Sequence, residues 1–163
     1  MRVLGIDPGS TVTGIGVVER KRGRLHYVDS GFVRTHADMP MTERLVAIHA
    51  GLVAAIEAHA PDAVAIEAIF HHKNAQSALR LGQARGVALL AAAQCGYEPF
   101  EYNPMVVKQT VGAHGRADKR GVAKMVQMLL GAEASGPYDV TDALAIAITH
   151  CSHARSVALG VVR

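Results

Sequence analysis

The spacing of apolar residues predicts three strands in the first part of the chain. Apolar and small residues dominate Val3–Asp7, Thr13–Glu19 and Leu25–Arg34, which are separated by the turn Pro8-Gly9-Ser10 and the basic segment Arg20–Arg24. Strands joined by such short turns pair with their neighbours, so this part of the sequence predicts an antiparallel meander.

The hydrophobic period then changes from that of strands to that of helices. Leu45, Ile48, Leu52 and Ile56 share one face of a helix predicted over Thr42–Ala60. The apolar run Ala63–Ile66 predicts a buried strand that ends at Glu67. The remaining predicted elements are a helix over Ala75–Ala93, a strand over Tyr97–Tyr102, a short helix from Asn103-Pro104 to about Thr110, and helices over Asp118–Leu130 and from Tyr138 to about His153.

This order predicts an α/β fold with a mixed five-stranded sheet flanked by helices. Right-handed crossovers should make the fourth and fifth strands parallel to the first. The 163 residues show no repeat or linker, so we expect a single domain over residues 1–163 whose last residues, 153–163, form a flexible tail.

Composition narrows the class of protein. Half of the residues are hydrophobic, which is typical of a globular domain, and the net charge of +3 with a pI of about 9.1 is compatible with a nucleic-acid partner. Cys95 and Cys151 are too few for a disulfide framework. With neither a membrane span nor a signal-peptide pattern in the sequence, we expect a cytoplasmic protein.

Four acidic residues stand at the ends of predicted elements. Asp7 and Glu67 each end an apolar strand, and Asp139 and Asp142 share a face at the start of a helix in PYDVTDALAIAITH. The carboxyl ends of strands are where open α/β sheets place their ligands. Taken separately, Asp7 reads equally well as a turn aspartate, and Asp139 and Asp142 as helix caps.

Taken together, the four carboxylates predict a metal site. They would repel one another strongly in a buried setting, and no Lys or Arg lies within three residues of any of them. Hard oxygen ligands suit Mg²⁺, with Mn²⁺ as an alternative. Two such ions, about 4 Å apart, would clamp the attacking and leaving oxygens of a phosphodiester.

Several segments resemble the RuvC family of bacterial Holliday junction resolvases from Met1 to about His153: GIDPGSTVTGIGVVE, IEAIFHHKNAQSALRLGQARGVALLAAA, VVKQT and DVTDALAIAITH. The resemblance implies a ribonuclease-H-like fold and a homodimeric, metal-dependent endonuclease of homologous recombination and DNA repair. Such an enzyme makes paired nicks in a four-way DNA junction, leaves 5′-phosphate ends and works with a branch-migration helicase. The family's catalytic and metal-binding acids fall on Asp7, Glu67, Asp139 and Asp142. Ala68 and the loop Val111–Arg116 depart from its usual pattern.

Further candidates would contact DNA. Phe70 could stack on an unpaired base, although a core phenylalanine is the alternative. Lys108 and Lys119 match positions that the family uses near its active site, and they lie in a basic segment that could otherwise be a solvated face. Asn74 and Arg80 are additional candidates.

Two other patterns receive a different interpretation. The histidine pairs His71-His72 and His150/His153 lack a complete zinc ligand set, so we interpret them as surface residues. A smooth stripe on the second predicted helix would suit another helix, either of the same domain or of a partner: Leu79, Gly82, Gly86, Leu90 and Ala93.

Three alternative functions remain open from the residues. The glycine-bearing hairpin GIDPGSTVTGIG also resembles the phosphate-binding start of actin-like ATPases and sugar kinases, but those need two such domains. A non-catalytic junction-binding module would be expected to lose some of the acids. A single-domain resolvase-like protein of uncertain activity would be expected to lack the loop with Phe70.

Overall fold

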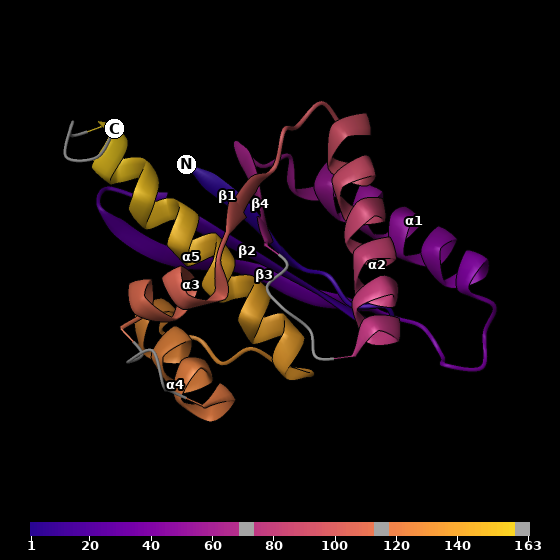
Figure 1. Ribbon diagram of the computed structural model, residues 1–163. Helices are drawn as coiled ribbons and strands as arrows, with labels where there is room; N and C mark the ends of the chain where they lie inside the picture. Colours follow the sequence, from indigo (N-terminus) through magenta and orange to yellow (C-terminus); the bar gives the residue numbers. More distant parts are fainter. Residues whose placement is uncertain (69–73, 113–117, 159–163) are drawn as a thin grey trace.

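The structure is a computed structural model that describes residues 1–68, 74–112 and 118–158. One mixed sheet lies between two helical layers (Figure 1). The elements follow the predicted order: β1 (Arg2–Asp7), β2 (Val12–Lys21), β3 (Arg24–Arg34), α1 (Met41–His59), β4 (Ala63–Glu67), α2 (Ala75–Gln94), β5 (Phe100–Tyr102), α3 (Pro104–Thr110), α4 (Lys119–Leu130) and α5 (Tyr138–Ala158).

The strand order in the sheet is β3-β2-β1-β4-β5. The first three strands pair antiparallel, while β4 runs parallel to β1 and β5 runs parallel to β4, as the sequence predicts. Ile6 pairs with Ile66, so the residues that follow them, Asp7 and Glu67, leave neighbouring strands at the same edge. The predicted mixed five-stranded sheet is confirmed.

Each face of the sheet has its own hydrophobic core. Because side chains alternate along a strand, Leu4 and Ile6 pack under α1 and α2, whereas Val3 packs under α3, α4 and α5. Figure 1 shows α5 lying along the sheet on the opposite side from α1 and α2.

Glycines on β1 and β2 form a groove for α5, a feature that was not predicted from the sequence. A Cβ at Gly5, Gly14 or Gly16 would overlap the backbone of α5, at Ala143, Asp139 or Leu144 respectively. The helix backbone therefore lies directly on the strands, which fixes the position of its first turn relative to β1.

Some predicted boundaries were wrong. β2 and β3 are longer than predicted and leave a two-residue turn, Arg22-Gly23, whose positive φ angles match the twist of a hairpin. The fifth strand does not begin at Tyr97, because the Tyr97 N–H donates to the Ala92 carbonyl at the end of α2 and Pro99 has no N–H for a ladder.

The last helix also continues beyond its predicted end near His153, to Ala158, so the first part of the predicted tail is helical. Among the described helices, none is both long and apolar enough to cross a membrane.

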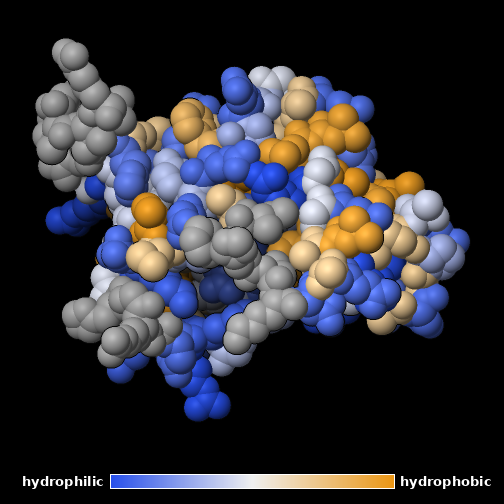
Figure 2. Space-filling model, viewed as in Figure 1, coloured by the Kyte–Doolittle hydropathy of each residue, from blue (hydrophilic) through white to orange (hydrophobic). Residues whose placement is uncertain are grey.

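The stripe predicted on α2 is largely exposed in the part of the chain that the structure describes. The buried face of this helix consists of Ala84, Ala88, Ala91 and Ala92. Leu79 and Leu90 are 63% and 51% exposed, and a Cβ at Gly82 or Gly86 would meet no described atom within 4 Å. In Figure 2, hydrophobic side chains lie on the upper right of the molecule, where Figure 1 places α1 and α2. Among the described residues, no other helix of the same domain buries the stripe, which leaves the alternative of a partner helix.

Candidate active site

One cavity of about 500 Å³ holds the predicted acidic residues at the carboxyl ends of β1 and β4. Its charged lining comprises Asp7, Glu67, Asp139, Asp142, Lys108 and Lys119. The fold thus brings together six of the nine candidate residues, from β1, β4, α3, α4 and α5.

The other three candidates lie elsewhere or outside the described part of the chain. Asn74 is the N-cap of α2, where its side chain accepts a hydrogen bond of 3.1 Å from the Ser77 N–H. Arg80 is exposed on the same helix and does not line the cavity. Phe70 lies outside the described residues, as do His71 and His72.

The four carboxylates are not used as local turn or helix caps by the described residues. No described hydrogen bond ends on a side-chain oxygen of Asp7, Glu67, Asp139 or Asp142. The capping interactions of this kind involve other residues, such as Asp118, which accepts from Gly121 N–H at 2.9 Å to start α4. The local alternatives for these acids thus find no support in the geometry.

Burial and mutual repulsion make three of the carboxylates, those of Asp7, Glu67 and Asp142, resist ionisation. Burial, followed by the charges of Glu67, Asp142 and Asp139, raises the pKa of Asp7 well above its ordinary value. Burial and then Asp142 raise the pKa of Glu67 to about 7, and burial also raises the pKa of Asp142. Such a site holds more negative charge than the folded chain neutralises.

Two lysines neutralise part of this charge. Lys119 Nζ lies 3.7 Å from Asp142 Oδ2, and its charge opposes the rise in the pKa of Asp142. Lys108 and Lys119 together oppose the rise in the pKa of Glu67. Because burial outweighs both lysines, the site retains capacity for a further cation.

The charge and the ligand chemistry of the cavity fit divalent cations. Carboxylate oxygens are the ligands that Mg²⁺ and Mn²⁺ prefer. Across residues 1–68, 74–112 and 118–158, no three Asp, Glu, His or Cys side chains already form a compact ligand set.

Arg44 fixes the turn that follows Asp7, and its role was not predicted from the sequence. Its guanidinium, which is buried in α1, donates from Nε to the Ser10 carbonyl at 2.8 Å and to Thr35 Oγ1 at 3.3 Å. Thr13 Oγ1 also donates to the Gly9 carbonyl at 2.8 Å. The sequence did carry one signal of this role, because Arg44 is a basic residue on the apolar face of its helix.

Arg85 supports Glu67 in a similar way. Its Nε donates to the Glu67 carbonyl at 3.4 Å, and its Nη2 lies 2.5 Å from Glu101 Oε2 on β5. The side chain therefore connects α2 to the ends of two strands beside the cavity. In sequence, Arg85 stands within Gly82–Gly86, which we interpreted in terms of helix packing alone.

His150 participates in an aromatic cluster. Its Nδ1 lies 2.9 Å from the Tyr102 hydroxyl, and its ring centroid lies 4.3 Å from that of Phe100. His153 approaches Thr110 Oγ1 at 3.4 Å. These contacts join α5 to β5 and α3, so His150 is a buried packing residue and the surface interpretation is wrong for it.

The raised pKa values predict how the stability of the metal-free protein depends on pH. Glu67 binds its proton more tightly in the folded state, so its contribution to the free energy of unfolding should fall as pH rises from 4.5 to about 7. We expect Glu67→Gln to gain on the order of 1–3 kcal/mol of stability over the wild type between pH 5 and 8. Denaturant unfolding with a chelator measures this difference.

Asp38→Asn is the matched control, because Asp38 is exposed in a turn outside the cavity. Its stability relative to the wild type should not change with pH. If Glu67→Gln behaved in the same way as this control, the repulsion inferred in the cavity would be contradicted.

Comparison with known proteins agrees with this geometry. The family described as "Crossover junction endodeoxyribonuclease RuvC" matches residues 3–150. Proteins of that name from Myxococcus xanthus and Chloroflexus aggregans are 51% and 53% identical to this chain, over 96% and 92% of it and 83% and 92% of the relatives. The yeast mitochondrial Holliday junction resolvase Ydc2, 11% identical with a TM-score of 0.62, shares the fold.

A solved structure of higher similarity is described as "T. thermophilus RuvC in complex with Holliday junction substrate". It has a TM-score of 0.89 and 40% identity, and the match covers 96% of each chain. From the family match, the near-complete coverage and the identity of its relatives, this chain belongs to the RuvC family of crossover junction endodeoxyribonucleases.

Proposed function

We propose that this chain is a structure-selective endonuclease that resolves four-way DNA junctions by paired, symmetric nicks in homologous recombination and DNA repair. The observation that carries the proposal is the cavity in which four acidic residues and two lysines meet, in a chain of this family. The Thermus thermophilus relative was solved with a Holliday junction substrate.

The alternatives find less support. A non-catalytic module gives no reason for four acids around one cavity, since the repulsion among Asp7, Glu67 and Asp142 costs stability. In actin-like proteins the glycine hairpin faces a nucleotide phosphate, whereas Gly14 and Gly16 here face the backbone of α5.

Nucleases of this family depend on a divalent metal ion. We infer that Asp7, Glu67, Asp139 and Asp142 hold two Mg²⁺ ions, with Mn²⁺ as an alternative. Bound there, the metal would polarise the phosphodiester and lower the pKa of the attacking water. Lys108 and Lys119, beside the acids, would stabilise the charge that builds up on the scissile phosphate. The 3′ oxygen would leave, giving a 5′-phosphate end.

We also propose DNA contacts outside the cavity. We place Phe70 against an unpaired base of the junction, and Asn74 and Arg80 near the DNA backbone. Asn74 caps α2, so its amide group can contact DNA while its Oδ1 accepts from Ser77.

A homodimer would give the junction two equivalent active sites. We propose the exposed stripe on α2 as a contact between copies, because Leu79 and Leu90 are exposed there and Gly82 and Gly86 permit close approach. The family further implies cooperation with a branch-migration helicase. Acting on bacterial chromosomal DNA, the protein would work in the cytoplasm.

The proposal is tested by cleavage of a synthetic four-way junction beside a duplex of the same sequence, with Mg²⁺, Mn²⁺ or a chelator. We expect metal-dependent nicks at symmetric positions in two opposing strands of the junction, and none in the duplex. Equal cutting of the two DNAs would refute structure selectivity. Tight junction binding without cutting in either metal would favour the binding module.

Phe70→Ala should lower junction cleavage more than junction affinity. Stacking of a base on an aromatic side chain is worth about 1–3 kcal/mol, so we expect a loss of about 10- to 100-fold in the cleavage rate. Affinity should change less, since phosphate contacts dominate it. Single-turnover cleavage and binding titrations measure both quantities. Phe100→Ala is the aromatic control, and equal losses in rate and affinity for Phe70→Ala would indicate a structural role.

A further inference from the structure

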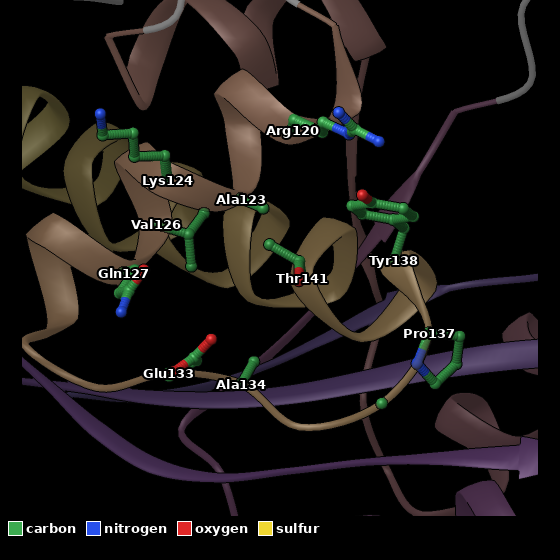
Figure 3. A pocket seen from close by; sticks show the side chains of 11 residues that line it. Arg120, Ala123, Lys124, Val126, Gln127, Glu133, Ala134, Pro137, Tyr138 and Thr141 are labelled. Atoms are coloured by element: carbon green, nitrogen blue, oxygen red, sulfur yellow. The ribbon is translucent and has the colours of Figure 1, made fainter.

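Figure 3 shows a second cavity, of about 530 Å³, beside the first turn of α5. The same turn carries Asp139 of the active site. It lies between α4, the start of α5 and the segment that joins them. Its polar lining consists of Arg120, Lys124, Gln127, Glu133, Tyr138 and Thr141.

The two cavities share the same helices. On α5, Asp139 and Asp142 line the active site, while Tyr138 and Thr141 line the second cavity. Neighbouring positions on a helix point about 100° apart, because one turn takes 3.6 residues. On α4, Lys119 faces the active site, and the next residue, Arg120, faces the second cavity. The two cavities therefore lie on neighbouring faces of α4 and of the first turns of α5.

The second cavity contains hydrogen-bond donors that the described residues leave without partners. Neither Arg120 nor Lys124 forms an ion pair with a described carboxylate. The side chains of Gln127 and Tyr138 likewise make no hydrogen bond to any described residue, and nor does that of Thr141, which is 9% exposed. These polar groups are open to the cavity, so a ligand bound there can accept hydrogen bonds from them.

The charge of the second cavity selects an anion. Two cations, Arg120 and Lys124, face one carboxylate, Glu133, so the lining has a net positive charge. In Figure 3 the Arg120 side chain extends above the Tyr138 ring, and Glu133 lies at the opposite end near Gln127. Arginine and hydroxyl groups together form a favourable setting for a phosphate oxygen.

We propose that this cavity binds a backbone phosphate of the DNA strand that is cut, beside the scissile phosphate. Arg120 and Lys124 supply the counter-charge, and Tyr138 and Thr141 donate from their hydroxyls. The contact fixes the register of the strand relative to Asp139 and Asp142 on the same turn of helix. This inference rests on the proposed junction-cleaving function.

The test uses the full chain with Arg120→Gln and Lys124→Gln combined. Both residues are exposed, so the variant should fold, which circular dichroism checks. Binding of a labelled junction is measured at several salt concentrations in Ca²⁺. We expect an affinity loss on the order of tenfold and a salt slope lower by about one to two. Single-turnover cleavage at saturating protein should also fall, because the register of the strand is lost.

Lys21→Gln with Arg24→Gln is the matched control, since it also removes one lysine and one arginine. The neighbouring Arg20 contacts the Cys151 carbonyl, which lies roughly 20 Å along α5 from Tyr138. This control should change neither the salt slope nor the saturating cleavage rate.

The outcomes separate this inference from the proposed function. Equal affinity, slope and cleavage for the Arg120/Lys124 variant and the wild type would overturn the inference, as would equal losses in the control. Thermal stabilisation of the wild type by inorganic phosphate, with junction binding unaffected by the two substitutions, would reassign the cavity to a free phosphate. Failure of the wild type to bind any junction would instead refute the proposed function.

Discussion

Asp7→Asn is expected to abolish cleavage of the four-way junction while leaving junction binding intact or tighter. Asp7 ends the central strand β1, with Gly14 of β2 on one side and the end of β4, at Glu67, on the other. An amide keeps the shape of the side chain but removes the charge that would hold a metal. We expect the cleavage rate in Mg²⁺ to fall at least about 1,000-fold, or roughly 4 kcal/mol.

The same substitution should stabilise the metal-free fold. Burial and the neighbouring carboxylates raise the pKa of Asp7, so ionised Asp7 destabilises the folded state near neutral pH. Asn removes this cost, and thermal unfolding in a chelator at pH 8 should occur at a higher temperature than in the wild type. This combination of lost activity and gained stability distinguishes a metal ligand from a structural aspartate.

Asp38→Asn again provides the control, with unchanged cleavage and unchanged stability. A near-normal cleavage rate for Asp7→Asn would show that Asp7 is not a catalytic ligand. Loss of stability together with activity would instead assign Asp7 to the fold.

Gly14→Ala should have the second largest effect, although glycine 14 touches no substrate. A Cβ here would overlap the Asp139 carbonyl and lie 2.9 Å from Val140 N, both in the first turn of α5. Because these atoms belong to backbone, a rotamer change cannot relieve the overlap, and the helix must move. We expect a loss of about 1–3 kcal/mol in the free energy of unfolding.

Cleavage should fall further than stability alone explains. The moved turn carries Asp139, and Asp142 follows it on the same face, so both would shift relative to Asp7 and Glu67. We expect the cleavage rate to fall on the order of 100-fold, since a displacement of about 1 Å has this effect on the rate that positioned catalytic groups support. The measurement is single-turnover cleavage at a temperature where the variant is fully folded.

Gly31→Ala is the matched glycine control, because Gly31 lies on β3 opposite Ile15 and a Cβ there meets no described atom within 4 Å. It should fold and cleave like the wild type. If Gly14→Ala were as stable and as active as Gly31→Ala, the close contact between β2 and α5 would not position the acids.

The contacts of Arg44 and Arg85, the two arginines beside the site, could not be predicted from local sequence patterns. Arg44 lies on a helix whose apolar face was predicted correctly, yet its partner Ser10 is 34 residues away. Arg85 reaches Glu67 and Glu101 from a third element. Hydrogen bonds of this kind depend on how elements pack, which the spacing of residues along one element does not encode.

The sequence by itself determined the order of the elements, the antiparallel meander, the parallel β4 and the acids at the element ends. These features follow from the period of apolar residues and from turn residues, which act over a few positions. The tertiary structure alone decided that α5 rests on Gly5, Gly14 and Gly16, that Lys119 meets Asp142, and that β5 begins at Phe100. These three features depend on which faces of the helices and strands meet and on how closely their backbones approach. The spacing of residues along one element does not encode either.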